Sequence, residues 1–183
     1  MALMKIINKL FKITTLLTLL YTLQLNAQDR DLERAGDIVM LLLPASSYAY
    51  THYQDDKDGR IEYYKSFATN AVVTYGLKYS VDAQRPDRSD NHSFPSAHTS
   101  LSFQSAAFLH KRYGLEKAIL SYIGATFVGY TRVVSEKHYI GDVIAGAVIG
   151  SLSSYFFTSK YENIEYSLDL TSNKRKMVIS YVW

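Results

Sequence analysis

The sequence contains no cysteine, and this absence removes several classes of protein at once. Disulfide-stapled domains, thiol nucleophiles and thiolate metal sites all require cysteine. Proline and glycine are also scarce, with three and nine among 183 residues. Because these residues interrupt regular structure, their scarcity favours long helices over many short strands. Apolar residues make up 48% of the chain, which excludes a disordered polymer and indicates a packed domain.

An excess of charge is also lacking once the N-terminus is set aside. The formal net charge is +3, but Lys5, Lys9 and Lys12 precede every acidic residue. Without these three lysines, the 20 basic residues become 17, equal to the 17 acidic ones. A neutral domain without a basic stripe gives no reason to expect nucleic-acid binding.

The N-terminus has the pattern of a secretory signal sequence. Its lysines precede or border an apolar run over residues 13–20, and the small-residue sequence Leu25-Asn26-Ala27 follows. The apolar run is short for a spanning helix, which needs about 20 residues, and a permanent membrane anchor is the alternative. We therefore predict that residues 1–27 are a signal peptide and that the chain is exported to the periplasm or cell envelope.

The hydrophobic pattern predicts an all-α domain over residues 28–160. Five helices are expected over residues 32–50, 62–79, 95–113, 116–133 and 138–157, with a polar turn at 55–59 and a polar loop at 82–94. Residues 161–183 differ, because apolar and polar residues alternate on both sides of a polar turn at 171–176. This period of two predicts a C-terminal β-hairpin.

Two of the expected helices approach the length needed to cross a membrane. Residues 38–54 and 143–159 are each uncharged for 17 residues, at the lower edge of spanning length, and both contain polar residues. We therefore predict a buried globular bundle, with contact at the membrane surface as the alternative.

Three short motifs in the middle of the chain carry side chains suited to phosphate chemistry. They are Lys78-x6-Arg85-Pro86, Pro95-Ser96-Ala97-His98 and Thr131-Arg132-x5-His138-x3-Asp142. Lys78, Arg85 and Arg132 border apolar segments with few carboxylates nearby in the sequence, so a phosphate would balance their charge. Ser96 and Ala97 stand at an expected helix start, where free N–H groups and the helix dipole favour an anion.

Two histidines complete the pattern. His138 and Asp142 are four residues apart and share one face of the expected helix. The carboxylate can fix the tautomer of the imidazole and leave its other nitrogen free to attack. His98, at the anion-binding helix start, is placed to donate a proton to a leaving oxygen. Each cluster alone is common in proteins, and their joint occurrence in this order is the informative feature.

Together the three motifs resemble the signature of the type 2 phosphatidic acid phosphatase and vanadium haloperoxidase superfamily. That signature reads Lys-x6-Arg-Pro, Pro-Ser-Gly-His and Ser-Arg-x5-His-x3-Asp. The chain departs from it at Ala97, where glycine is usual, and at Thr131, where serine is usual. The backbone amide and the hydroxyl survive these two changes. The resemblance implies an α-helical bundle and a hydrolase that needs no metal or other cofactor.

The resemblance also implies a role for each matched residue. His138 is expected to attack phosphorus and form a phosphohistidine, His98 to act as the acid, and Asp142 to orient His138. Five groups are expected to bind the phosphoryl oxygens: Lys78, Arg85, Ser96, the Ala97 amide and Arg132. The implied activity is that of an acid phosphatase or phosphatidic acid phosphatase on a phosphorylated lipid or a small-molecule phosphate. A vanadium haloperoxidase and a non-catalytic, phospholipid-binding envelope protein are the alternatives.

The polar loop at 82–94 contains further candidate ligands. Asp82, Asp87 and Asp90 fit no calcium-loop spacing, so we interpret them as solvated charges and expect no metal site. His92 matches no motif and is interpreted as an ordinary loop residue.

Overall fold

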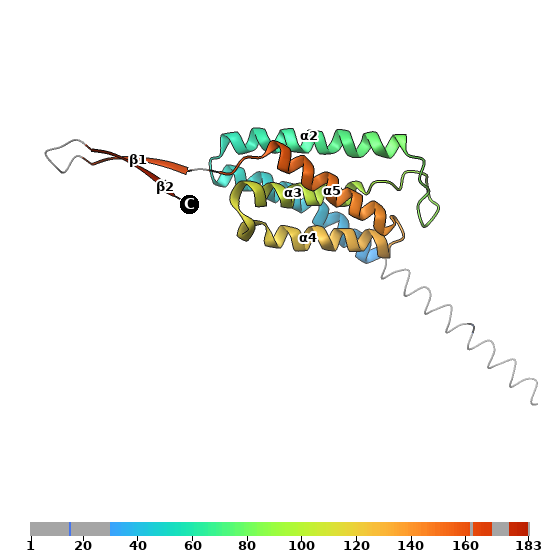
Figure 1. The fold of residues 1–183 in the computed structure, drawn as a ribbon. Helices are drawn as coiled ribbons and strands as arrows, with labels where there is room; N and C mark the ends of the chain where they lie inside the picture. The colour runs from blue at the N-terminus through green and yellow to red at the C-terminus, as the bar shows by residue number, and fades with distance from the viewer. Residues whose placement is uncertain (1–14, 16–29, 162, 170–175, 183) are drawn as a thin grey trace, which may run out of the picture.

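The computed structural model describes residues 15, 30–161, 163–169 and 176–182. Within these ranges the chain forms five helices: an N-terminal helix over residues 30–53, then α2 (Lys57–Ser80), α3 (Ala97–Tyr113), α4 (Leu115–Val134) and α5 (Ile140–Phe157) (Figure 1). The predicted helical bundle is thereby confirmed. Two antiparallel strands follow, β1 (Asn163–Asp169) and β2 (Lys176–Val182). The predicted signal peptide, apart from Thr15, and residues 171–175 of the predicted polar turn at 171–176 lie outside the described residues.

Local sequence explains where α2, α3 and α4 begin and end. Asp56 caps α2 by accepting the amide of Gly59 at 2.8 Å, so residues predicted as a turn form the first turn of this helix. Ser96 caps α3 by accepting the amide of Thr99 at 3.4 Å. Gly114 separates α3 from α4 with a φ of 96°, a backbone conformation that favours glycine.

The start of α5 differs from the sequence prediction. The spacing predicts that this helix starts at His138, but it begins at Ile140, with Tyr139 as its N-cap. The carboxylate of Asp142 accepts the backbone N–H of Tyr139 at 2.9 Å, which fixes the helix start at this point. His138 therefore lies in the connection between α4 and α5 and not on a helix face.

α3 is the central helix of the bundle (Figure 1). No residue of α3 is exposed, and α3 contacts α2, α4 and α5, whereas α4 and α5 barely touch each other. α5 approaches α3 very closely, because a β-carbon at Gly146 or Gly150 would collide with the backbone of Ser96 or Ser100. The N-terminal helix completes the enclosure, with Leu43 in a small apolar cluster that includes residues of α3 and α4.

The interior of the bundle is rich in small polar side chains. They are paired with one another or with the backbone, as in the hydrogen bond from Gln104 to Ser66 at 2.8 Å and the contact between Thr74 and Ser100 at 2.8 Å. Hydrogen bonding of this kind removes most of the free-energy cost of burying polar groups. The core is therefore held by polar contacts and close backbone approach more than by large apolar side chains.

Large apolar side chains instead lie on the outer faces of the four helices that surround α3. Thirteen aliphatic residues there are 50–79% exposed: Ile38, Leu41, Leu42, Ile61, Val72, Leu115, Ile119, Leu120, Ile123, Ile140, Ile144, Val148 and Leu152. Within the described ranges one helix, α5, is long and apolar enough to cross a membrane, and 28% of it is buried. This surface does not fit the predicted buried globular bundle, in which the large apolar residues would face inward.

Charged residues gather at the two ends of the bundle. Residues 38–54, 66–77, 99–109, 118–131 and 143–159 contain no Asp, Glu, Lys or Arg. The residues predicted to carry chemistry lie beyond these stretches at one end. At the other end, Arg112 and Asp56 form a buried two-pronged ion pair with N–O distances of 2.6 and 2.7 Å.

Candidate active site

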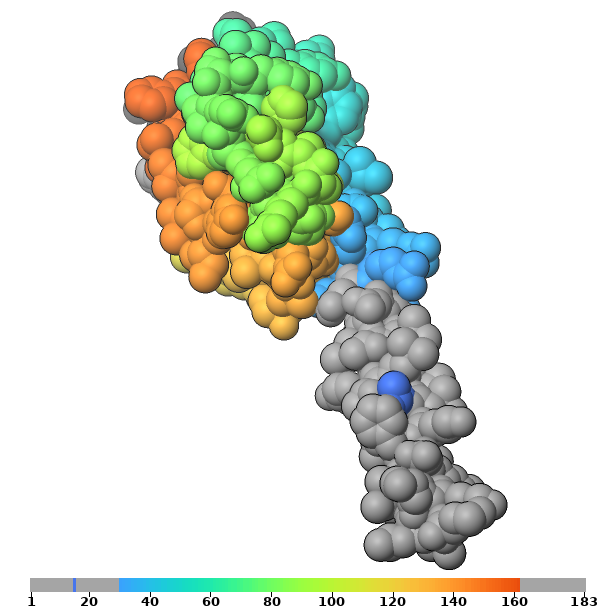
Figure 2. All heavy atoms as spheres, turned by 90° about the vertical axis from the view of Figure 1, so that its right-hand side faces the viewer, coloured from blue at the N-terminus to red at the C-terminus, as the bar shows by residue number. Residues whose placement is uncertain are grey.

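A cavity of about 400 Å³ opens at the end of the bundle where α2 ends and α3 begins. Figure 2 looks onto this end, where the loop after α2 (green) lies beside the connection between α4 and α5 (orange) and near the N-terminal helix (blue). Six of the eight residues predicted for the site line the cavity: Lys78, Arg85, Ala97, His98, Arg132 and His138. The other two, Ser96 and Asp142, are buried and do not line it.

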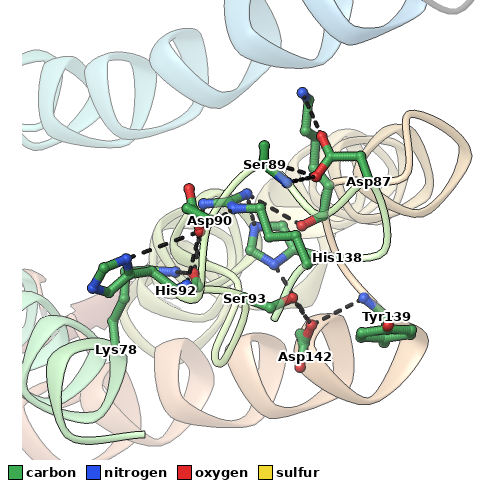
Figure 3. A network of polar contacts seen from close by, with 11 residues as sticks. Lys78, Asp87, Ser89, Asp90, His92, Ser93, His138, Tyr139 and Asp142 are labelled. Atoms are coloured by element: carbon green, nitrogen blue, oxygen red, sulfur yellow. Dashed lines mark hydrogen bonds and ion pairs between the residues drawn. The ribbon is translucent and has the colours of Figure 1, made fainter. Parts of the chain in front are cut away.

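His138 is buried, with one ring nitrogen near a cationic side chain and the other near a carboxylate. Nε2 lies 3.4 Å from Nη1 of Arg85, and Nδ1 lies 3.7 Å from Oδ2 of Asp142 (Figure 3). The same carboxylate oxygen accepts the hydroxyl of Ser93 at 2.5 Å and the amide of Tyr139 at 2.9 Å. The expected pairing of His138 with Asp142 is therefore an ion-pair contact longer than a hydrogen bond, and Nε2 is the nitrogen that faces the cations.

The surroundings keep the imidazole of His138 neutral. Burial, together with the charges of Arg85 and Lys78, lowers the pKa of His138 to about 4, although Asp142 acts in the opposite direction. A neutral imidazole has the lone pair that attack on phosphorus requires. At neutral pH the imidazole of His138 is therefore in the neutral form that the predicted attack on phosphorus needs.

The loop after α2 holds two of the three cations in place. Lys78 Nζ donates to the backbone carbonyl of His92 at 2.7 Å. Arg85 Nε donates to Oδ1 of Asp90 at 2.8 Å. Asp90, interpreted from the sequence as a solvated charge, is exposed but also pairs with Arg85. The cations therefore have carboxylate partners that the sequence did not make obvious. His92 contributes through its backbone, which no side-chain motif could indicate.

The same loop is tied to the connection between α4 and α5. Lys137 Nζ lies 2.9 Å from Oδ2 of Asp87, so Asp87 is also paired rather than merely solvated. The amide of Asp87 donates to the carbonyl of Glu136 at 3.1 Å, and Arg85 Nη1 donates to the carbonyl of Lys137 at 3.1 Å. These contacts fix Arg85 relative to His138. No group of three or more His, Cys, Asp or Glu in the described part of the chain is placed to hold a metal ion.

The start of α3 contributes His98 and a helix N-terminus to the cavity. His98 lies in the first turn and lines the cavity, as does Ala97. Ala97 is helical and has no positive φ, so alanine in place of the usual glycine causes no backbone strain. The hydroxyl of Ser96 contacts Oγ1 of Thr99 at 3.0 Å and caps the helix. The hydroxyl of Ser96 therefore caps α3 and does not line the cavity, whereas Ala97 and His98 in the first turn of α3 do.

Asp37, on the N-terminal helix, was not identified from the sequence. Its Oδ1 lies 2.9 Å from Nη1 of Arg132 and 3.1 Å from Nε2 of His98. The backbone carbonyl of Glu33 accepts Nη2 of Arg132 at 2.7 Å. Gly36 permits this approach, because a β-carbon there would collide with side chains of α4. The one sequence feature that points to Asp37 is a carboxylate next to a long apolar run, where an unpaired charge is costly.

A comparison with known families identifies the family of this chain. Residues 44–166 match the family model of the PAP2 superfamily. The chain belongs to the PAP2 superfamily. The match covers every residue predicted to carry chemistry and leaves the first part of the N-terminal helix outside it.

Two relatives share parts of this sequence. Lipid A 1-phosphatase of Porphyromonas gingivalis is 37% identical over 78 residues, which cover 41% of this chain and 18% of that protein. Bacitracin transport permease protein BcrC of Bacillus licheniformis is 33% identical over 128 residues, which cover 61% of this chain and 56% of that protein. The chain thus spans less than two thirds of the length of either relative.

Two solved structures share the fold of this PAP2 chain. LpxE of Aquifex aeolicus superposes with a TM-score of 0.60 at 19% identity, covering 71% of this chain and 84% of that one. A transmembrane PAP2-type phosphatidylglycerolphosphate phosphatase of Bacillus subtilis superposes with a TM-score of 0.54 at 22% identity, covering 73% and 74%. At these identities the likeness concerns the arrangement of the helices.

Proposed function

We propose that this PAP2 chain is a membrane-associated phosphatase that hydrolyses lipid phosphomonoesters or diphosphates through a phosphohistidine intermediate. The observation that carries the proposal is the convergence of two imidazoles and the three predicted cations on one cavity of about 400 Å³. A phosphate ester is the chemistry that this combination suits, because cations bind its oxygens while one imidazole attacks and the other protonates. Membership of the PAP2 superfamily and the lipid A 1-phosphatase among the relatives support the reaction class.

In the first step Nε2 of His138 attacks phosphorus, and the bond from phosphorus to the leaving oxygen breaks. Arg85 Nη1, 3.4 Å from Nε2, is close enough to turn to a phosphoryl oxygen when substrate enters. Together with Lys78 and Arg132 it would stabilise the charge on the transferring group. Asp142, 3.7 Å from Nδ1, would stabilise the positive charge of the phosphorylated imidazole.

His98 supplies a proton in the first step and recovers it in the second. Protonated His98 gives its proton to the leaving oxygen, so an alcohol or phosphate departs rather than an anion of high basicity. Water then attacks phosphorus, the bond from phosphorus to Nε2 of His138 breaks, and neutral His98 takes a proton from the water. Inorganic phosphate is released, and both imidazoles return to their starting forms.

The outer surface supports a lipid as the organic part of the substrate. The uncharged stretches of the four outer helices, 12–17 residues long, measure about 18–26 Å at 1.5 Å per residue, and the longest of them nearly match the roughly 30 Å hydrocarbon core of a bilayer. Tyr75, Tyr79 and Tyr139 are exposed near the cavity end, as in the aromatic belts of membrane interfaces. The cavity would then lie at the interface, where lipid phosphates are. Export to the cell envelope stays a prediction from the N-terminal sequence.

The test is phosphate release by the purified full-length chain in detergent with EDTA present. The substrates are p-nitrophenyl phosphate, phosphatidate and an isoprenyl diphosphate. His138→Ala is expected to lower kcat by at least about 10³-fold, and Asp82→Asn, in the same loop region but outside the cavity lining, serves as the control. Near-normal turnover by the His138 variant would remove the proposed nucleophile. Bromide oxidation with vanadate and peroxide, without phosphate release, would replace the proposal by a haloperoxidase.

A further inference from the structure

A carboxylate from outside the matched family region reaches the proposed active site. Asp37 lies on the N-terminal helix, seven residues before the family match begins at residue 44. One of its oxygens, Oδ1, is 3.1 Å from Nε2 of His98 and 2.9 Å from Nη1 of Arg132. A single carboxylate oxygen thus connects the start of α3 with the end of α4. We propose that Asp37 is a positioning residue that holds His98 as the proton donor of the reaction.

The geometry assigns different tasks to the two nitrogens of His98. Nε2 donates its hydrogen to Asp37, because a carboxylate can only accept. Nδ1 is then the nitrogen that carries the proton for the leaving oxygen. A fixed carboxylate partner on one nitrogen sets the orientation of an imidazole ring and the place of its mobile proton. Without Asp37 the ring would have no such partner among the described residues and could present either nitrogen to the cavity.

Positive charges surround His98, so it needs a nearby carboxylate if it is to stay protonated and act as a proton donor. Burial and the charges of Arg132 and Arg85 lower the pKa of His98, and Asp37 is the group that opposes them. An acid donates only from its protonated form, so two neighbouring arginines reduce the fraction of protein that is ready to react. Asp37 restores part of that fraction by stabilising the imidazolium. Its contact with Arg132 means that its removal also disturbs phosphate binding, and the experiment has to separate the two effects.

The dependence of the rate on the leaving group separates the effect on His98 from the effect on Arg132. This part of the test rests on the proposed phosphatase activity. A general acid matters for a basic leaving oxygen and hardly at all for a good leaving group. Asp37→Asn is therefore expected to lower kcat/KM, which reports the step in which the leaving group departs, on an alkyl or phenyl phosphate by about 10–100-fold more than on 2,4-dinitrophenyl phosphate. An effect that acts only through Arg132 would lower both equally. In a His98→Ala background, Asp37→Asn should add no further leaving-group dependence, because the group it serves is gone.

Controls and a second readout make each outcome decisive. Asp31→Asn makes the same charge change on the same helix at an exposed residue paired with Arg34, and it should match wild type. Titration of ¹⁵N-labelled histidine in the full-length protein should show that the His98 midpoint moves to lower pH in Asp37→Asn. An unchanged midpoint, or an equal loss on all leaving groups, would overturn the inference while the proposed function stands. If wild type releases no phosphate, the proposed function fails, and the titration alone decides whether Asp37 governs His98.

Discussion

The end of the bundle opposite the cavity is held by one buried carboxylate. Asp56 is 4% exposed, and it accepts Nε and Nη2 of Arg112 at 2.7 and 2.6 Å, the hydroxyl of Tyr113 at 2.7 Å and the amide of Gly59 at 2.8 Å. It therefore joins the end of α3 to the start of α2. Asp56→Ala removes all four bonds and leaves Arg112 buried, with Glu62 at 3.3 Å as its remaining acidic partner.

The size of the expected loss of stability in Asp56→Ala follows from these contacts. Removal of one partner of a buried ion pair costs about 3–5 kcal/mol. Because Glu62 still reaches Arg112, we take the lower end of that range, and loss of the helix cap adds about 1 kcal/mol. We therefore expect Asp56→Ala to lower the free energy of unfolding by about 4 kcal/mol. Turnover by the protein that stays folded should be nearly unchanged, because the cavity lies at the other end.

Chemical unfolding in detergent, followed by circular dichroism, measures this change. Asp58→Ala is the matched control, since it removes an exposed acidic residue from the first turn of the same helix and should cost only a few tenths of a kcal/mol. Adding Arg112→Met to Asp56→Ala should recover part of the stability, because it removes the unpaired charge. A loss below about 1 kcal/mol for Asp56→Ala would refute the reasoning.

Two further predictions concern catalysis and packing. The pKa of His138 lies at about 4, so protonation should remove the nucleophile as the pH falls through about 4. We therefore expect kcat/KM to stay constant as the pH is lowered from neutral to about 5. A fall of kcat/KM that begins above about pH 6 would contradict this prediction. Gly150→Ala should lower the free energy of unfolding by about 1–3 kcal/mol, because the added carbon meets the backbone of Ser100. Gly76→Ala, with no atom within 4 Å of the added carbon, should raise it by about 0.5–1 kcal/mol. Similar effects of the two substitutions in thermal unfolding would disprove the close packing of α5 on α3.

The sequence motifs located the cavity because they lie at the ends of helices that meet there. Lys78 ends α2, His98 begins α3 and Arg132 ends α4, so a bundle with short connections brings them together. The relation between His138 and Asp142 was less predictable. A spacing of four residues implies one helix face only when the helix is continuous, and the cap at Tyr139 places His138 before the helix.

The carboxylates that hold the cations could not be found from local patterns. Asp37 and Arg132 are 95 residues apart, and only the packing of the N-terminal helix on α4 brings them into contact. Asp90 is close to Arg85 in the sequence, but it lies in a loop without periodicity. Loop contacts depend on turns and backbone hydrogen bonds, such as the one from the amide of His92 to Asp90 at 2.7 Å, which residue spacing does not encode.

The composition could not show that polar residues lie inside the bundle and large apolar residues on its surface, the reverse of the usual distribution. A content of 48% apolar and 20% charged residues is ordinary for a soluble domain. The difference lies in position, since the charges are confined to the helix ends and small polar residues such as Ser100 and Gln104 face inward. Hydrophobic periodicity marks one face of a helix but does not say whether that face meets the core or a lipid.

This packing has a direct consequence for the proposed chemistry. In a bilayer, apolar surface does not drive helices together, so close contact of small residues and hydrogen bonds must do so. Gly146 allows α5 to lie against the first turn of α3, and the amide of Ser96 donates to the carbonyl of Asp142 at 3.0 Å. The starts of these two helices carry the proposed acid, His98, and the support of the proposed nucleophile. The glycine contacts that hold a polar-cored bundle together therefore also help to set the distance between the proposed acid and the proposed nucleophile.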